Sequence, residues 1–333
     1  MVSTQQFAHP VQTLRDNIAG LKTAIALVLV NPKKKAVHRL RTTARRIEAQ
    51  LTLLEQIAQL SKHAGPARKA TRLLRKFRRA AGKVHDLDIQ RDLLKNPQQL
   101  KRAINRPSNS EPFSQAFQLN RHLVQDTKSL RKTLKYRREA EAHGLVRMLR
   151  RHHVRLSRAL GNLLEALVPP ESLTVSAARV FTLTRDWYHR ELRTRSKPNP
   201  TPDELHAIRK SAKLARYIAE SSLSAKPQQL ARVFEDLQQS GGTWHDLLQL
   251  HEVAQHELGK DSPVTKSLAR MTESTVRDYR RKLADPIPGG TLHRQQLVRA
   301  PRTETPLDPN VASKPFKENQ HAAKPARPRR RVP

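Results

Sequence analysis

The chain has 333 residues, enough to bury one large hydrophobic core or two of ordinary size. Its 64 Lys and Arg residues outnumber the 29 Asp and Glu residues and give a formal charge of +35, an excess that is costly through self-repulsion unless an anionic partner neutralises it. The absence of cysteine excludes disulfides, thiolate nucleophiles and zinc sites with Cys ligands. The positive charge leaves three classes of anionic partner: nucleic acid, a long-chain phosphate and an anionic membrane surface.

The N-terminal part of the chain shows the periodicity of amphipathic helices. Apolar residues recur at helical spacing from Val11 to Val28, and a second apolar stripe, about six turns long, runs from Val37 to Ala58. A Gly-Pro break at 65–66 introduces a third helix, which we expect to end at Gly82. A short helix should follow it, with Asp86 as its cap.

Polar and Pro-rich connections separate the next predicted helices. Residues 96–112 are polar and interrupted by proline, which predicts a loop. Residues 113–168 predict two long basic helices, or one helix broken near Gly144. Pro169 and Pro170 then mark a boundary between two halves of the chain.

The second half begins with a predicted helix over 173–195, and its next helix starts at a capping box, Thr201 with Glu204 three residues later. Periodicity is lost near the end, so 286–333 is predicted to be a disordered, Pro-rich basic tail. The apolar run Ala24–Val30 is far shorter than the ~20 residues that span a bilayer. We therefore expect a cytoplasmic protein with no transmembrane segment.

One face of the third predicted helix carries a row of arginines. The row lies within about 60° at 100° per residue, opposite the apolar face, and consists of Arg68, Arg72, Arg75 and Arg79. Two interpretations of this row are open: a helix face that is exposed to solvent, and a surface that binds a polyanion.

The stretch that begins at Val37 recurs 168 residues later. The shift carries apolar and basic positions together, from Val37, His38, Leu40, Arg41, Ala44 and Arg45 onto Leu205, His206, Ile208, Arg209, Ala212 and Lys213. A second match, Gly82–Leu87 with Gly242–Leu247 at a shift of 160, has a His-Asp pair in both copies. Two amphipathic helices can share a pattern of apolar positions by chance. A match of the apolar and the basic positions together is much harder to obtain by chance.

These repeats predict an all-α domain over 1–285, built from two pseudo-symmetric antiparallel helical bundles, about 10–168 and 171–285. Within each copy the repeated His, Arg and Arg/Lys side chains lie within about 60° of one another, beside the apolar stripe. We expect them to point into a basic central groove between the halves.

The two motifs together are similar to those of a known family. A repeated His-x-x-Arg-x-x-x-Arg/Lys helix, followed within about 50 residues by Gly-x-x-x-Asp-Leu, resembles the CHAD family, the conserved histidine α-helical domain, over about 10–285. The resemblance implies a two-lobed helical bundle with a basic channel or groove that binds inorganic polyphosphate, in a protein located on polyphosphate granules. Members of the family are often fused to a CYTH-type triphosphate-hydrolysing domain with a Glu-x-Glu-x-Lys motif, and no such motif occurs in this sequence, so we expect binding without catalysis and with no cofactor or metal.

The resemblance places eight residues on the binding surface: His38, Arg41, Arg45 and Arg46 in the first half, and His206, Arg209, Lys213 and Arg216 in the second. The arginines Arg72, Arg75 and Arg79 of the third helix complete the predicted polyphosphate-binding set. Asp86 and Asp246 are predicted to be structural, as helix caps or as partners that orient arginines, because a carboxylate inside a phosphate track would oppose binding.

Four positions depart from the family pattern. Glu48 and Leu214 stand where basic residues are usual, and His85 and His245 stand where arginine usually precedes the aspartate. Arg and Lys suit phosphate oxygens, and we expect affinity to fall steeply with salt. The histidines should add charge as the pH falls toward about 6.5.

Three other functions remain open at this point. His38 with the His85-Asp86 pair resembles the ligand set of HD-type metal-dependent phosphohydrolases, although the neighbouring cations disfavour a metal ion. Nonspecific nucleic-acid binding fits the charge, but only 4% of the residues are aromatic and none interleaves with the basic stripes to stack bases, so we expect it to be weak. A basic helical scaffold that coats anionic surfaces is the third.

Overall fold

The computed structural model describes residues 7–57, 64–95, 113–167, 173–194, 200–285 and 287–288, with the backbone alone at 64 and 113–120. The predicted loop at 96–112 and the prolines at 169–170 lie outside the described residues, as does the predicted tail except for Ile287 and Pro288. All described residues belong to one unit, 1–299.

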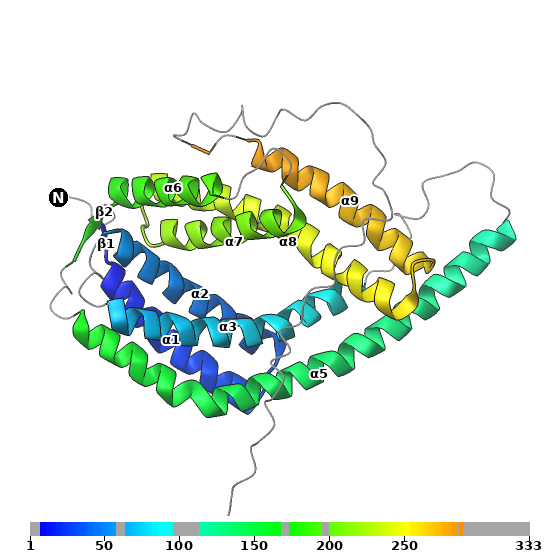
Figure 1. Ribbon diagram of the computed structural model, residues 1–333, viewed down its shortest axis with the longest axis horizontal. Coiled ribbons are helices and arrows are strands. Elements are labelled where there is room, and N and C mark those ends of the chain that lie inside the picture. Colours follow the sequence, from blue (N-terminus) through cyan, green and yellow to red (C-terminus); the bar gives the residue numbers. More distant parts are fainter. Residues whose placement is uncertain are drawn as a thin grey trace, which may run out of the picture. The chain divides into compact units, whose positions relative to one another are not determined.

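In the part of the chain that the structure describes there are eight helices and one pair of short strands (Figure 1). The helices are α1 (Pro10–Val30), α2 (Lys34–Gln56), α3 (Ala64–Leu93), α5 (Phe113–Ala166), α6 (Ala177–Arg193), α7 (Pro202–Ala219), α8 (Ala225–Leu258) and α9 (Pro263–Leu283). The strands are β1 (Phe7–Ala8) and β2 (Val175–Ser176). The all-α prediction is confirmed, and none of the described helices is long and apolar enough to cross a bilayer.

Helices α3 and α5 continue through the positions where we expected breaks. α3 runs past Gly82 without interruption, and α5 runs past Gly144 as a single helix. A glycine inside a helix costs only ~1 kcal/mol relative to alanine, and Ala81 and Val84 beside Gly82 are fully buried. Burial of these neighbours outweighs the cost, so the predicted helix end is wrong and Asp86 lies inside α3 rather than at a cap.

The two predicted helix starts in the second half have different outcomes. The helix expected from Leu173 begins later, because β2 comes first and the Ser176 hydroxyl then caps α6 by accepting a hydrogen bond from the Arg179 N–H at 3.3 Å. The capping box of α7 is confirmed: Thr201 Oγ1 accepts from the Glu204 N–H at 3.3 Å, and the Glu204 carboxylate accepts from the Thr201 N–H at 2.8 Å.

Each half closes its own hydrophobic core. α1, α2, α3 and the C-terminal part of α5 enclose one cluster, which includes the fully buried Leu40 and Phe77. α6, α7, α8 and α9 enclose another, which includes Phe234 and Tyr279. The apolar stripes predicted from periodicity are the faces that meet in these cores.

Two further apolar contacts join the halves. Leu130 and Leu134, from the N-terminal part of α5, pack with Leu250 of α8 in a separate cluster, so α5 contacts the first-half core at one end and the second half at the other (Figure 1). α2 packs against α7 through a small cluster that includes Leu53 and Ile218. The helices that carry the repeated motif are therefore direct neighbours.

The strand pair shows that the repeat is a spatial symmetry. β1 and β2 are antiparallel, with Phe7 opposite Ser176 and Ala8 opposite Val175. In the repeat, which relates residues 168 positions apart, Phe7 corresponds to Val175 and Ala8 to Ser176. Replacing each residue by its counterpart turns the pair Phe7–Ser176 into the pair Val175–Ala8, and the reverse. This exchange is what a twofold axis between the strands produces, and it confirms the predicted pseudo-symmetric halves.

Candidate functional site

The structure brings both copies of both motifs together where α2 and α7 meet. We call this group the central basic cluster. Its members are His38, Arg41 and Arg45 on α2, His85 and Asp86 on α3, His206, Arg209 and Lys213 on α7, and His245 and Asp246 on α8. The His38 side chain is exposed and the others are half-buried, so the cluster is open to solvent.

Each half contributes a pair of facing histidines to the cluster. His38 of α2 faces His85 of α3 with ring centroids 5.2 Å apart, and His206 of α7 faces His245 of α8 at 4.0 Å. The first motif of each half thus meets the second motif of the same half. His85 and His245, which depart from the family pattern, lie in the cluster itself.

These histidines are neutral at physiological pH. Burial first, and nearby cations second, lower the pKa of His85 and of His245 to about 3. The same causes lower the pKa of His38 and, more strongly, that of His206, where His245 also contributes. In the free protein, burial and positive neighbours oppose protonation, so these groups do not gain charge near pH 6.5 there.

The neutral rings can still bind an anion as hydrogen-bond donors. The Nδ1 atoms of His85 and His245 are buried and meet no hydrogen-bond partner among the described residues. A buried N–H without a partner costs desolvation energy, so the tautomer with the proton on Nε2 is favoured. In that form each ring offers an Nε2–H.

The two aspartates face arginines from both halves. Arg41 Nη2 lies 3.5 Å from Asp86 Oδ1. The charge of Asp86 also acts on Arg209, and that of Asp246 acts on Arg209 and Arg41. Burial raises the pKa of Asp246 to about 6 and also raises that of Asp86, while the arginines oppose the change. Both aspartates lie inside helices, so of the two predicted roles the contacts fit the orienting partner and not the cap.

Lys213 shows that positive charge is in excess here. Burial, followed by the charges of Arg41, Arg45 and Arg209, lowers its pKa to about 7. A carboxylate that dominated the surroundings would move this pKa the other way. The cluster itself contains four basic side chains, Arg41, Arg45, Arg209 and Lys213, and two carboxylates, Asp86 and Asp246.

Glu48 partly neutralises the first-half copy of the motif. Its carboxylate accepts from Arg78 Nε at 3.0 Å and lies 3.4 Å from Arg45 Nη1. Only 9% of Glu48 is exposed, and burial lowers the pKa of Arg45 to about 10. Glu48 thus positions two guanidinium groups. Arg78 was not predicted, although it precedes His85 by seven residues and so lies on the same side of α3.

Two of the predicted residues border the cluster and are paired with glutamates. Arg216 Nε donates to Glu220 at 2.6 Å, and its Nη1 lies 2.9 Å from Glu235. Arg46 lies 3.8 Å from Glu220. The guanidinium groups of Arg46 and Arg216 lie 5.8 and 5.6 Å from the centre of the Tyr217 ring. These contacts hold them at the α2–α7 junction.

The three other predicted arginines extend the cluster without joining it. Arg72, Arg75 and Arg79 are exposed on α3. They precede Asp86 by 14, 11 and 7 residues, which places all three within about 40° of it around the helix axis. They continue the basic face from the cluster toward the start of α3.

The donor set is cationic rather than metal-binding. Within the described ranges, no group of three or more His, Cys, Asp or Glu side chains is arranged to hold a metal ion. The Asp86 carboxylate, which the HD-type alternative would use as a ligand, lies against Arg41 instead.

The fold and the cluster define a two-lobed helical module that concentrates cations and neutral histidines beside its pseudo-twofold axis. The family model of the CHAD domain matches residues 12–255, and the chain belongs to the CHAD family. The crystal structure of the CHAD domain from the plant Ricinus communis has a similar fold, with a TM-score of 0.56 and 15% sequence identity, over 86% of this chain and 96% of that chain. A comparison with curated proteins found no match.

Proposed function

We propose that this protein binds inorganic polyphosphate at the central basic cluster and does not catalyse a reaction on it. The observation that carries the proposal is the gathering of basic side chains from both halves around Lys213, where four cations meet two aspartates, and where burial and then the neighbouring arginines lower the pKa of Lys213 to about 7. An anion with many closely spaced charges would relieve that repulsion. The family resemblance suggests which anion this is.

The side chains of the cluster suit a flexible phosphate chain. Arginine can donate two parallel hydrogen bonds to phosphate oxygens, and Arg41 and Arg209 are held in place by the two aspartates. The Nε2–H groups of His85 and His245 add neutral donors. Aromatic residues that could stack bases do not interleave with these cations, which favours polyphosphate over single-stranded nucleic acid.

A non-catalytic role fits the way the acidic groups are used. Asp86 and Asp246 face arginines, and these arginines favour their charged forms. Each carboxylate is thus placed to orient a cation, although burial outweighs the effect of the arginines and raises both pKa values. Purified protein should therefore release no phosphate from polyphosphate, with or without added divalent metal.

The test compares equal losses of charge at two places. We expect the triple variant Arg41→Ala/Arg209→Ala/Lys213→Ala to bind long-chain polyphosphate on the order of a hundredfold more weakly than the wild type, with a salt slope smaller by about three. The matched control is Arg232→Ala/Arg277→Ala/Lys260→Ala, which removes two arginines and one lysine from exposed positions. Fluorescence anisotropy at several salt concentrations measures both quantities, and circular dichroism checks folding.

Two results would contradict the proposal. The first is an equal loss of affinity in both triple variants, which would indicate a nonspecific basic scaffold. The second is failure of excess polyphosphate to displace RNA or DNA near physiological salt, which would indicate a nucleic-acid-binding protein.

A further inference from the structure

A second cationic site lies between the beginning of α3 and the C-terminal part of α5. A cavity of about 510 Å³ opens there, which we call the α3–α5 cavity. Its polar lining includes Lys69 from α3 and Arg151, Arg155, Arg158 and Asn162 from α5. Among the described residues that line it, none is Asp or Glu.

The four cations converge from two helices. Arg151, Arg155 and Arg158 are spaced by four and three residues and so share one face of α5, while Lys69 lines the cavity from α3. All four side chains are exposed, and none forms an ion pair with another described residue. Charges of one sign around a concave surface reinforce one another's field, which attracts an anion more strongly than the same charges on a convex helix face.

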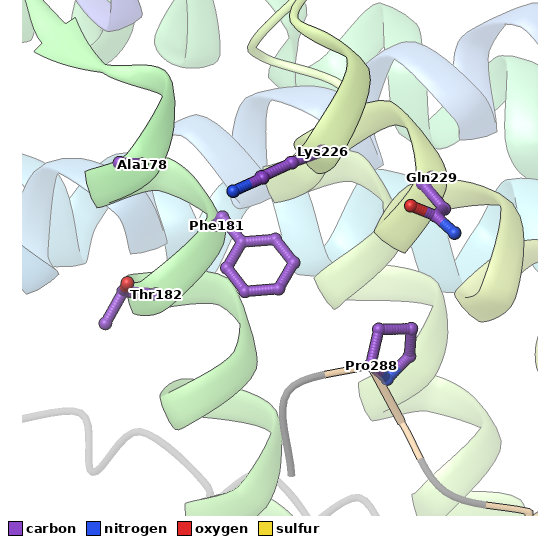
Figure 2. Close-up of a pocket in the computed structure, with 6 residues that line it drawn as sticks. All are labelled: Ala178, Phe181, Thr182, Lys226, Gln229 and Pro288. Atoms are coloured by element: carbon purple, nitrogen blue, oxygen red, sulfur yellow. The ribbon is translucent and has the colours of Figure 1, made fainter.

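The other half of the repeat provides an internal comparison. The start of α8 corresponds to the start of α3, so Gln229 stands where α3 has Lys69. A cavity of about 300 Å³ lies beside Gln229, between α8 and α6, and Lys226 is the one charged side chain among the described residues that line it (Figure 2). The second half thus has no lysine at the position of Lys69 and no comparable group of described cations around this cavity.

Along the axis of α3, the arginine row lies between this cavity and the central basic cluster, with Lys69 turned by about 60–120° from the row. Lys69 and Asp86 are 17 residues apart on one helix, a rise of about 25 Å. Arg72, Arg75 and Arg79 lie between them on the side of α3 that faces the cluster. An extended polyanion bound at one end of the row would find further cations along the whole distance.

We propose that the α3–α5 cavity is a second phosphate site, which holds a distal stretch of the same polyphosphate chain that occupies the central basic cluster. This inference rests on the proposed function. Two linked sites make the second binding step intramolecular, so a chain long enough to reach both gains affinity that a short one does not. The protein then selects long polyphosphate over short.

The experiment uses the full chain and two ligands, tripolyphosphate and long-chain polyphosphate. The cavity variant is Arg151→Ala/Arg155→Ala/Arg158→Ala. Its matched control is Lys128→Ala/Lys132→Ala/Lys135→Ala, three exposed cations on the same helix with the same spacing of four and three. We expect the cavity variant to lose about tenfold or more in affinity for the long chain, and the control to lose less than about threefold.

Tripolyphosphate separates the two sites. Calorimetry should find one fewer tripolyphosphate bound by the cavity variant than by the wild type, with the remaining site unchanged. The inference is overturned if the cavity variant matches its control with both ligands. Loss of binding in the cavity variant, with full affinity kept by the triple cluster variant described above, would instead overturn the proposed function and leave the cavity as the primary site.

Discussion

Lys213 is the residue whose charge depends most on what occupies the cluster. Arg41 and Arg45 face it from α2, and Arg209 and Arg216 lie on its own helix. Asp86 from α3 and Asp246 from α8 are the opposing charges. With a pKa of about 7 in the free protein, Lys213 is roughly nine-tenths neutral at pH 8.

Polyphosphate binding at pH 8 should therefore take up close to one proton. Bound phosphate favours the ammonium form and raises the pKa of Lys213, so the complex holds more protons than the free protein above about pH 7. Affinity should be highest near and below pH 7 and should fall as the pH rises toward 9. Calorimetry in two buffers of different ionisation enthalpy measures the uptake.

Lys213→Arg is the control for this proton uptake. An arginine keeps its charge throughout this pH range, so the variant should bind with no uptake and with an affinity that does not change between pH 7 and 9. An uptake equal to that of the wild type would assign the proton to another group.

At the scale of the helix, close packing decides which glycine can be replaced. Gly241 and Gly242 are neighbours in α8 and look equivalent in the sequence. A Cβ at Gly241 would lie 2.6 Å from Cζ of Tyr279 on α9, whereas one at Gly242 would meet nothing closer than Arg209 Nη1 at 3.8 Å. The Tyr279 ring is fully buried and stacks on Trp244, so it has little room to move.

We expect Gly241→Ala to lower the free energy of unfolding by about 1–3 kcal/mol, because overpacking at Tyr279 exceeds the gain in helix propensity. Gly242→Ala should leave it unchanged or raise it by up to about 1 kcal/mol. Urea unfolding of the two full-length variants measures the difference. Equal stability of the two would mean that α8 and α9 are not as close as the structure shows.

Helices α3 and α5 show why element boundaries were the weakest part of the sequence prediction. Glycine often marks the end of a helix, so the sequence predicts a break at Gly82 and near Gly144. The burial of their neighbours, which depends on packing with other helices, keeps both helices continuous. The capping box at Thr201 was predictable because its hydrogen bonds are local.

At the scale of the molecule, the proposed function predicts where the protein is found. Tagged protein should form foci in cells that accumulate polyphosphate and should be diffuse in cells that lack it. The cluster variant Arg41→Ala/Arg209→Ala/Lys213→Ala should also be diffuse. Foci that persist unchanged without polyphosphate would contradict the prediction.

The basic tail provides the comparison for this experiment. The five cations Lys324, Arg327, Arg329, Arg330 and Arg331 lie in the sequence of the tail. Their replacement by alanine removes more charge than the three cluster substitutions, but we expect the foci to remain. Loss of foci in the tail variant alone would assign the localisation to nonspecific charge.

The helical class, the two halves and the motif in each half were predictable from residue order alone, because apolar periodicity and a repeated spacing are properties of that order. The contact of His38 with His85, and the contacts of Glu48 with Arg45 and Arg78, became known from the packing of the helices. The same packing places Lys213 among arginines of both halves, which lowers its pKa. Distances between helices and the burial of charge arise from packing, and no spacing along the chain encodes them.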